Sequence, residues 1–221
     1  MKKWTAFALM ITVAGLALFA EQPTAEARCT AWKVFGTGKA LPPITFRKVP
    51  RSPAEFIKMT KRLSNKPEGG AAAMLLALLV YSKNQKLGTQ LVTIAIAPAL
   101  RSKGCRGVSY KGFCPKPIDR QRLKMRLKGK NGYKIRSFFK GAEPENGYTP
   151  AKPLTVQFHD NPYTKSRDGK SMRLLSFNCG ASRTRPITVV KTPYGWKAKE
   201  WSSMTSGVRR PVKPAASGGA F

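Results

Sequence analysis

The segment 177–203 constrains the fold most strongly, because it contains the clearest β-hairpin pattern in the chain. The β-branched run 187–191 is typical of a strand, residues 192–195 (TPYG) are turn formers, and residues 196–201 (WKAKEW) begin a return strand. A strand that returns directly onto its neighbour pairs with it antiparallel. The hairpin therefore predicts an antiparallel sheet, which the upstream elements must cover.

The return strand of this hairpin has two different faces, because successive side chains of a strand point to opposite sides. One face carries Trp196, Ala198 and Glu200, and the other carries Lys197, Lys199 and Trp201. We expect Trp196 to anchor the first face in the core and the second face to be exposed and cationic. Two arginines precede the hairpin and add possible hydrogen-bond donors for an anion. The candidate binding residues are Arg183, Arg185, Lys197, Lys199 and Trp201.

Three helices are expected before the strands. Ser52, Pro53 and Glu55 form a helix start, with a capping serine, a proline in the first turn and a glutamate three residues after the cap. A second helix begins at Pro67 and carries the apolar run 71–81, whose eleven residues are too few to cross a bilayer. The segment 87–98 fits a third helix, although its core LVTIAI is also compatible with a strand.

Strands follow the helices, so the sequence predicts an α+β fold. The alternating segments 154–158 and 172–178 are predicted strands. Residues 119–128 could be a helix or a strand, and the Asn-Gly pair at 131–132 favours a strand over 122–128 paired with 133–140. The expected architecture is three N-terminal helices on one face of a mainly antiparallel sheet, in a cone-like or two-layer arrangement.

The domain limits follow from composition. Residues 28–50 lack helical periodicity and are expected to form an extended arm, with a possible strand at 44–49. A single domain then spans 51–207. The Pro-, Gly- and Ser-rich tail 208–221 is basic and is expected to be disordered.

The N-terminus is typical of a secretory signal. Lys2 and Lys3 precede an apolar run over residues 4–20, and Ala25-Glu26-Ala27 supplies small residues for cleavage before Arg28. The alternative is an uncleaved membrane anchor, although the run is shorter than the roughly 20 residues that a spanning helix needs. We therefore expect residues 1–27 to be a signal peptide and the protein to be periplasmic, envelope-bound or secreted.

The balance of charges is strongly positive. The chain has 41 Lys and Arg against 10 Asp and Glu, and residues 1–27 hold two of each sign, so the mature chain keeps the formal charge of +31. Such a charge attracts polyanions in a salt-dependent way. For an exported protein we expect an anionic envelope or extracellular polymer, or a membrane surface, as the partner, and no sequence-specific nucleic acid.

Four cysteines, Cys29, Cys105, Cys114 and Cys179, remain after cleavage. An even number in an oxidising compartment favours two disulfides, and of the three connectivities we prefer Cys105 with Cys114 and Cys29 with Cys179. Zinc is the competing interpretation, but the chain lacks a C-x-x-C pair and His159 is its one histidine. We expect neither a metal nor a cofactor.

Catalytic constellations are weak in this sequence. His159 and Asp160 are neighbours, and adjacent strand residues face opposite sides, so the carboxylate is poorly placed to orient the imidazole. Glu143 and Glu145 could form a glycosidase pair, but two acids in a turn more often shape it or form ion pairs. The P-loop, H-E-x-x-H and G-x-S-x-G motifs are missing from the sequence. We therefore expect no catalytic residues.

The leading hypothesis is a non-enzymatic binding or structural module. The alternative is an enzyme or small-ligand domain of the nuclear-transport-factor-two-like type, with a pocket lined by Glu143, Tyr148 or His159. A third hypothesis is a membrane-surface protein retained by its uncleaved N-terminus.

Several segments also carry a family resemblance. They are residues 137–148 (SFFKGAEPENGY), Asn161-Pro162, Gly180-Ala181 before Arg185-Pro186-Ile187, Trp196, residues 200–203 (EWSS) and residues 207–209 (GVR). Over residues 51–211 the chain resembles a family of exported bacterial domains of unknown function. The resemblance implies an envelope or secreted location and an α+β fold, and it implies no reaction.

The signal-peptide interpretation predicts the mature N-terminus. N-terminal sequencing of the protein recovered from outside the cytoplasm should begin at Arg28, because cleavage follows the small residue Ala27. Recovery of a chain that still begins with residues 1–27 would instead support the membrane-retained form.

Overall fold

The computed structural model describes residues 38–161, 166 and 168–212. The predicted signal peptide, Cys29 and residues 213–221 lie outside the described residues. The helices are α2 (Pro53–Thr60), α3 (Pro67–Lys83), α4 (Gln85–Ala95), α5 (Pro117–Leu127) and α6 (Tyr133–Arg136). The strands are β1 (Ile44–Phe46), β2 (Arg101–Lys103), β3 (Phe113–Pro115), β4 (Leu154–Val156), β5 (Phe158–His159), β6 (Ser171–Ser176), β7 (Arg185–Thr192) and β8 (Gly195–Glu200). Short 3-10 helices are η2 (Leu63–Asn65), η3 (Pro98–Leu100), η4 (Gly129–Gly132) and η6 (Ser202–Thr205).

The hairpin predicted near the C-terminus is formed by β7 and β8. It closes a four-stranded antiparallel sheet of order β5-β6-β7-β8. Its turn ends at Gly195, whose φ of +86° would be strained for any other residue. A Cβ at this position would also lie only 2.6 Å from the carbonyl oxygen of Ser64. Glycine is therefore required where the hairpin passes the helical layer.

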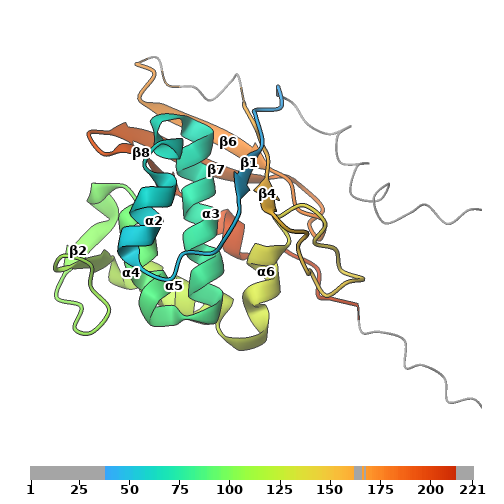
Figure 1. Cartoon of the computed structure of the whole chain (residues 1–221), viewed down its shortest axis with the longest axis horizontal. Coiled ribbons are helices and arrows are strands. Elements are labelled where there is room, and N and C mark those ends of the chain that lie inside the picture. The colour runs from blue at the N-terminus through green and yellow to red at the C-terminus, as the bar shows by residue number, and fades with distance from the viewer. Residues whose placement is uncertain (1–37, 162–165, 167, 213–221) are drawn as a thin grey trace, which may run out of the picture.

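Helix α3 is the centre of the molecule. Every residue from Glu68 to Tyr81 is buried, because α4 covers one side and strands β6, β7 and β8 lie against another (Figure 1). Nine of these fourteen residues are Ala, Leu or Met, and burial of a large apolar side chain contributes about 1.5–3 kcal/mol. The apolar run 71–81 thus forms the buried central helix that the sequence predicted.

The starts of the N-terminal helices follow their sequence patterns. The Ser52 hydroxyl accepts the Glu55 amide proton at 3.1 Å, and Pro53 occupies the first turn of α2. The Asn84 side chain caps α4 by accepting the Leu87 amide proton at 3.0 Å. Residues 91–95 lie in the helix, and Ile96 then leaves it and bridges Ala198 of β8 in parallel. The predicted α+β fold class is confirmed.

The strand predicted over 122–128 and its hairpin partner 133–140 are wrong. Residues 117–127 form α5, in which Leu123 and Leu127 are both buried while Met125 between them is 63% exposed. Two leucines four residues apart lie on the same side of a helix. Their spacing therefore fits a helix, although the alternation of apolar and basic residues in this segment resembles a strand. The pair Asn131-Gly132 lies in η4, and Gly132 has φ of −59° rather than the positive φ of a tight hairpin turn.

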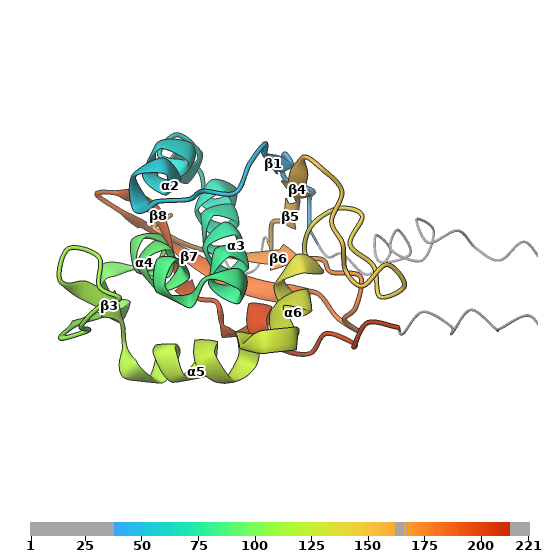
Figure 2. The same cartoon turned by 60° about the horizontal axis from the view of Figure 1, so that its bottom comes forward.

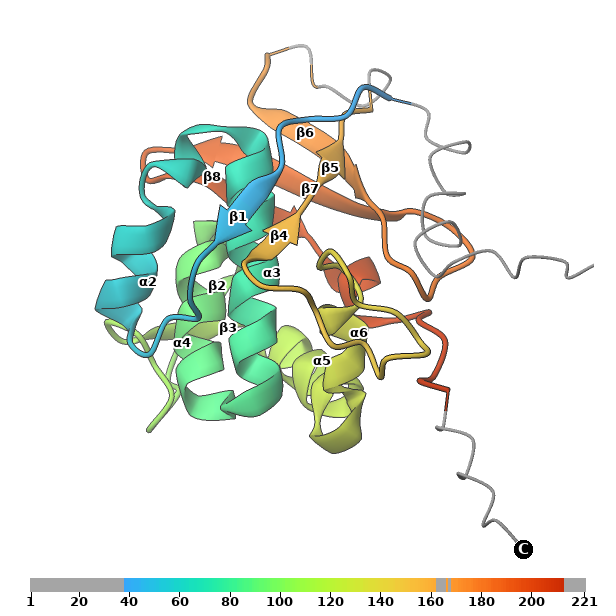
Figure 3. The same ribbon diagram turned by 45° about the vertical axis from the view of Figure 1, so that its right-hand side comes forward.

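The arm contains a strand within the expected range 44–49, and the first residues of the tail pack on the domain. Strand β1 pairs with β4 antiparallel, so the second half of the arm is bound to the domain (Figure 3). The predicted strand 154–158 divides into β4, which pairs with β1, and β5, which pairs with β6. In the tail, the Arg209 amide donates to the Gly180 carbonyl at 2.7 Å and Val208 is buried beside Tyr148, so the predicted disorder is wrong for residues 208 and 209.

The described disulfide joins Cys105 and Cys114 across the β2–β3 loop, with a Cα–Cα distance of 6.1 Å. This bond is compatible with the pairing that the sequence favours. Cys179 is also disulfide-bonded. Its pairing with Cys29 stays a prediction, because Cys29 lies outside the described residues.

The close contact between α3 and α4 predicts the effect of a single methyl group. A Cβ on Gly88 would overlap the backbone of Tyr81. Gly88→Ala should therefore lower the free energy of unfolding by roughly 1–3 kcal/mol, as measured by urea denaturation. Lys86→Ala, at an exposed position of the same helix, is the control and should change it by less than about 0.5 kcal/mol. Equal stability of the two variants would contradict the described contact.

Candidate functional site

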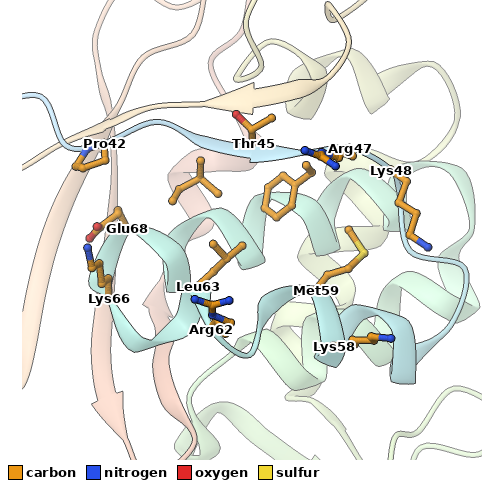
Figure 4. A pocket seen from close by; sticks show the side chains of 12 residues that line it. Pro42, Thr45, Arg47, Lys48, Lys58, Met59, Arg62, Leu63, Lys66 and Glu68 are labelled. Carbon is orange, nitrogen blue, oxygen red and sulfur yellow. The ribbon is translucent and has the colours of Figure 1, made fainter.

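The described pocket is an open groove of about 600 Å³ between β1 and the segment that runs from α2 into the start of α3 (Figure 4). Strand β1 and its flanking residues form one wall, and residues from α2, η2 and the first turn of α3 form the other. The lining residues are Pro42, Ile44, Thr45, Phe46, Arg47, Lys48, Lys58, Met59, Arg62, Leu63, Lys66 and Glu68.

The groove has an apolar floor. Phe46 is buried, and Ile44, Met59 and Leu63 are partly buried and pack against the main core. Met59 and Leu63 point from the helical wall towards β1 (Figure 4). The floor can therefore contact the apolar part of a ligand.

The rim of the groove is cationic. Its five basic side chains, from residues Arg47, Lys48, Lys58, Arg62 and Lys66, are all exposed. Lys48 forms an ion pair with Glu55, and hydrogen bonds from Lys48 and from the Arg51 amide lower the pKa of Glu55. The other four cations of the rim form no ion pair within the described residues.

The one acidic residue of the lining is Glu68, in the first turn of α3. It is buried, and it lies at the same end of the groove as Lys66 (Figure 4). The positive end of the helix dipole stabilises a carboxylate at this place. Because this single carboxylate lies at one end of the groove, it can neutralise at most one cation of the rim. Most of the rim therefore keeps an uncompensated positive charge.

The candidate residues of the hairpin region do not form one site. Arg183 and Lys199 are exposed, whereas the Arg185 guanidinium donates to the Gly207 carbonyl at 2.6 Å. None of the five predicted binding residues lines the groove.

The expected exposure of Lys197 and Trp201 is wrong, because they are 8% and 2% exposed. A register shift between Thr188 and Val189 interrupts the pairing of β7 with β8, and Trp201 has ψ of 0°, which is not a strand conformation. The alternation of side chains between the two faces of β8 therefore does not extend to Trp201. At the outer edge of β8, Ala97 donates to the Ala198 carbonyl, and this connection brings the following Arg101 near Lys197.

Lys197 is a buried cation beside another cation. Burial, and then the nearby charge of Arg101, lower its pKa from 10.5 to about 8. The Arg101 guanidinium donates to the Ile96 carbonyl at 3.1 Å, while its buried Nε has no hydrogen-bond partner in the part of the chain that the structure describes. Lys197 therefore weakens the folded state when it is protonated.

The residues expected to line an enzyme pocket have other contacts. Tyr148 is fully buried, its hydroxyl donates to the Arg209 carbonyl at 2.9 Å, and burial raises its pKa to about 12. The His159 ring lies edge-on to Phe177, and the Asp160 carboxylate accepts the Lys39 amide proton instead of orienting the imidazole. Neither Tyr148, His159 nor Glu143 lines the groove.

Within residues 38–161, 166 and 168–212, no cluster of three His, Cys, Asp or Glu side chains could hold a metal ion. Over the same described ranges, no helix has both the length and the apolar composition to span a membrane.

Sequence reasoning missed the groove, although part of its rim has a visible pattern. Lys58, Arg62 and Lys66 are spaced four residues apart along the chain. The opposite wall comes from β1, whose position against α2 depends on its pairing with β4 more than 100 residues later. The rim could therefore have been suspected from the sequence, but the groove itself could not.

The structure is an α+β domain with a groove whose rim carries five basic side chains. The family described as a domain of unknown function, DUF6935, matches residues 48–212, and the chain belongs to this family. The match confirms the resemblance to a family of domains of unknown function. No curated protein and no solved structure matches the chain significantly.

The burial of Lys197 predicts a pH-dependent change in stability. Its pKa is about 8 in the folded state and near 10.4 when unfolded, so the unfolded state binds more protons between these values and stability rises with pH through this window. Lys197→Met should raise the free energy of unfolding by roughly 2–3 kcal/mol at pH 7. This gain should shrink as the pH approaches 10.

Chemical denaturation at pH 7 and pH 10 measures the effect. Lys199→Met, at an exposed position two residues along the same strand, should change stability little at either pH. A Lys197→Met variant that is destabilised at pH 7 would show that the buried ammonium makes a favourable interaction.

Proposed function

We propose that this protein is an exported, non-enzymatic binding module that holds an anionic envelope or extracellular polymer in the groove between β1 and α2. The observation that carries the proposal is the combination of an apolar floor with four rim cations that have no ion-pair partner among the described residues. These four, Arg47, Lys58, Arg62 and Lys66, come from both walls.

The composition of the groove fits an acidic polysaccharide better than a fully polar ligand. Sugar rings have apolar faces that can lie on Ile44, Met59 and Leu63, while carboxylate, phosphate or sulfate groups reach the rim. Arg47 and Arg62 can bind such groups through two parallel hydrogen bonds, whereas the lysines act as mobile point charges. The groove is open, so a polymer chain can enter it from the side.

The charge of the whole chain supports the same partner. A formal charge of +31 on 221 residues creates a long-range attraction for anions. This attraction speeds association but does not select a polymer. Selectivity has to come from local geometry, which the groove provides.

Export is part of the proposal and has two supports. The first 27 residues have the organisation of a secretory signal. The Cys105–Cys114 disulfide is compatible with an oxidising compartment.

Neutralising the rim should weaken polymer binding more than neutralising other cations. The groove variant is Arg47→Gln, Lys58→Gln, Arg62→Gln and Lys66→Gln, and the matched control is Lys140→Gln, Lys152→Gln, Lys191→Gln and Lys199→Gln, which also removes four exposed charges. At a fixed low salt concentration, we expect the groove variant to bind dextran sulfate at least tenfold more weakly than the control. The slope of log affinity against log salt should also become shallower.

Two outcomes would contradict the proposal. Equal losses in the two variants would show that binding depends on diffuse charge and not on the groove. Failure of the unmodified protein to bind any anionic polysaccharide at low salt would exclude this partner class.

A further inference from the structure

The outward side of α5 exposes large apolar residues. Ile118 and Met125 are 59% and 63% exposed, and Phe113 in the adjoining β3 is 39% exposed. They are three of the five large hydrophobic residues that are exposed in the described part of the chain. Seven residues separate Ile118 from Met125, which is two helical turns, so both point to the same side of α5.

The other side of α5 is buried. Asp119, Leu123 and Leu127 lie there, spaced four residues apart. At 3.6 residues per turn, the direction of Ile118 and Met125 lies roughly 150° from the centre of this buried side. The exposed apolar pair is therefore not an extension of the core.

The segment of the chain that contains the apolar pair is strongly basic. Residues 101–130 contain eleven Lys and Arg and one acid, Asp119, which gives this segment a formal charge of +10. The basic residues are Arg101, Lys103, Arg106, Lys111, Lys116, Arg120, Arg122, Lys124, Arg126, Lys128 and Lys130. Asp119 is already paired with Arg122 at 2.6 Å. Lys116, Lys124 and Lys128 are exposed and lie on or beside α5.

We propose that this surface, formed by Ile118 and Met125 with the exposed Lys116, Lys124 and Lys128 on or beside α5, docks the protein onto an anionic lipid bilayer. We call it the α5 face. The apolar side chains enter the interfacial region of the bilayer, and the lysines contact anionic headgroups. A helix that lies in the plane of an interface with Lys beside apolar residues uses both contributions at once.

The shape and the charge of the α5 face favour a bilayer over the other partners. Helix α5 runs along one outer boundary of the molecule, where a flat surface can contact its whole length (Figure 2). A second copy of the chain would bring another segment of formal charge +10 against the first, so self-association through this face is disfavoured. A polyanion alone would leave Ile118 and Met125 in water, whereas a bilayer covers them.

The α5 face is separate from the groove. Figure 2 shows β1 and α2 on the opposite side of the molecule from α5. Membrane docking therefore goes beyond the proposed function and leaves the groove open to a polymer.

Vesicle co-sedimentation of the secreted form tests the inference. The protein should bind vesicles of phosphatidylglycerol and phosphatidylcholine, should not bind pure phosphatidylcholine, and should dissociate as salt rises. The variant Ile118→Ser with Met125→Ser keeps the charge and should reduce partitioning onto the anionic vesicles at least fivefold. The matched control, Tyr194→Ser with Val212→Ser, removes two exposed apolar residues elsewhere and should bind as the unmodified protein does.

Further readouts separate this inference from the groove proposal. Both serine variants should keep the dextran sulfate affinity, and the groove variant should keep vesicle binding. Matching thermal unfolding curves will show that the exposed substitutions leave the fold intact. Absence of binding to anionic vesicles, or equal binding by the Ile118→Ser/Met125→Ser variant and the unmodified protein, would overturn the inference.

Discussion

The structure depends on the burial of α3. Its residues from Glu68 to Tyr81 are apolar or small with few exceptions and are covered on all sides, and α4, α6, η2 and strands β6, β7 and β8 pack directly against this helix. Close approach is possible because Gly70 meets β8 and Gly88 of α4 meets α3 at backbone distance. Residues 71–81 all belong to the main hydrophobic core, whereas the lysines and arginines of the described residues, with Lys197 as the exception, are at least partly exposed.

This division between core and surface produces two separate cationic features. The groove lies where β1 crosses the helical layer, and it is concave with an apolar floor. The α5 face is an exposed helix with apolar residues that point outward. Positive charge is common to both, so our proposal of a polymer for one and a bilayer for the other rests on the difference in shape and in the position of apolar atoms.

Local patterns in the sequence predicted those parts of the fold that depend on local interactions. Ser52 and Pro53 identified the start of α2, the run 71–81 identified the central helix, and the turn before Gly195 identified the hairpin. Prediction failed in α5, where the sequence fits both the alternation of a strand and the spacing of a helix. It also failed at Trp201, because a register shift between β7 and β8 changed the face of the sheet to which this side chain points. The groove depends on the pairing of β1 with β4, which no local pattern encodes.

The central claim is that the groove, and not the overall charge, selects the polymer. Lysine labelling with an amine-reactive probe, read by mass spectrometry with and without dextran sulfate, tests this claim residue by residue. We predict strong protection of Lys58 and Lys66 in the rim, and weak protection of Lys140 and Lys191 elsewhere on the surface. Uniform protection of all four lysines would contradict the account, because it would show that the polymer binds without reference to the groove.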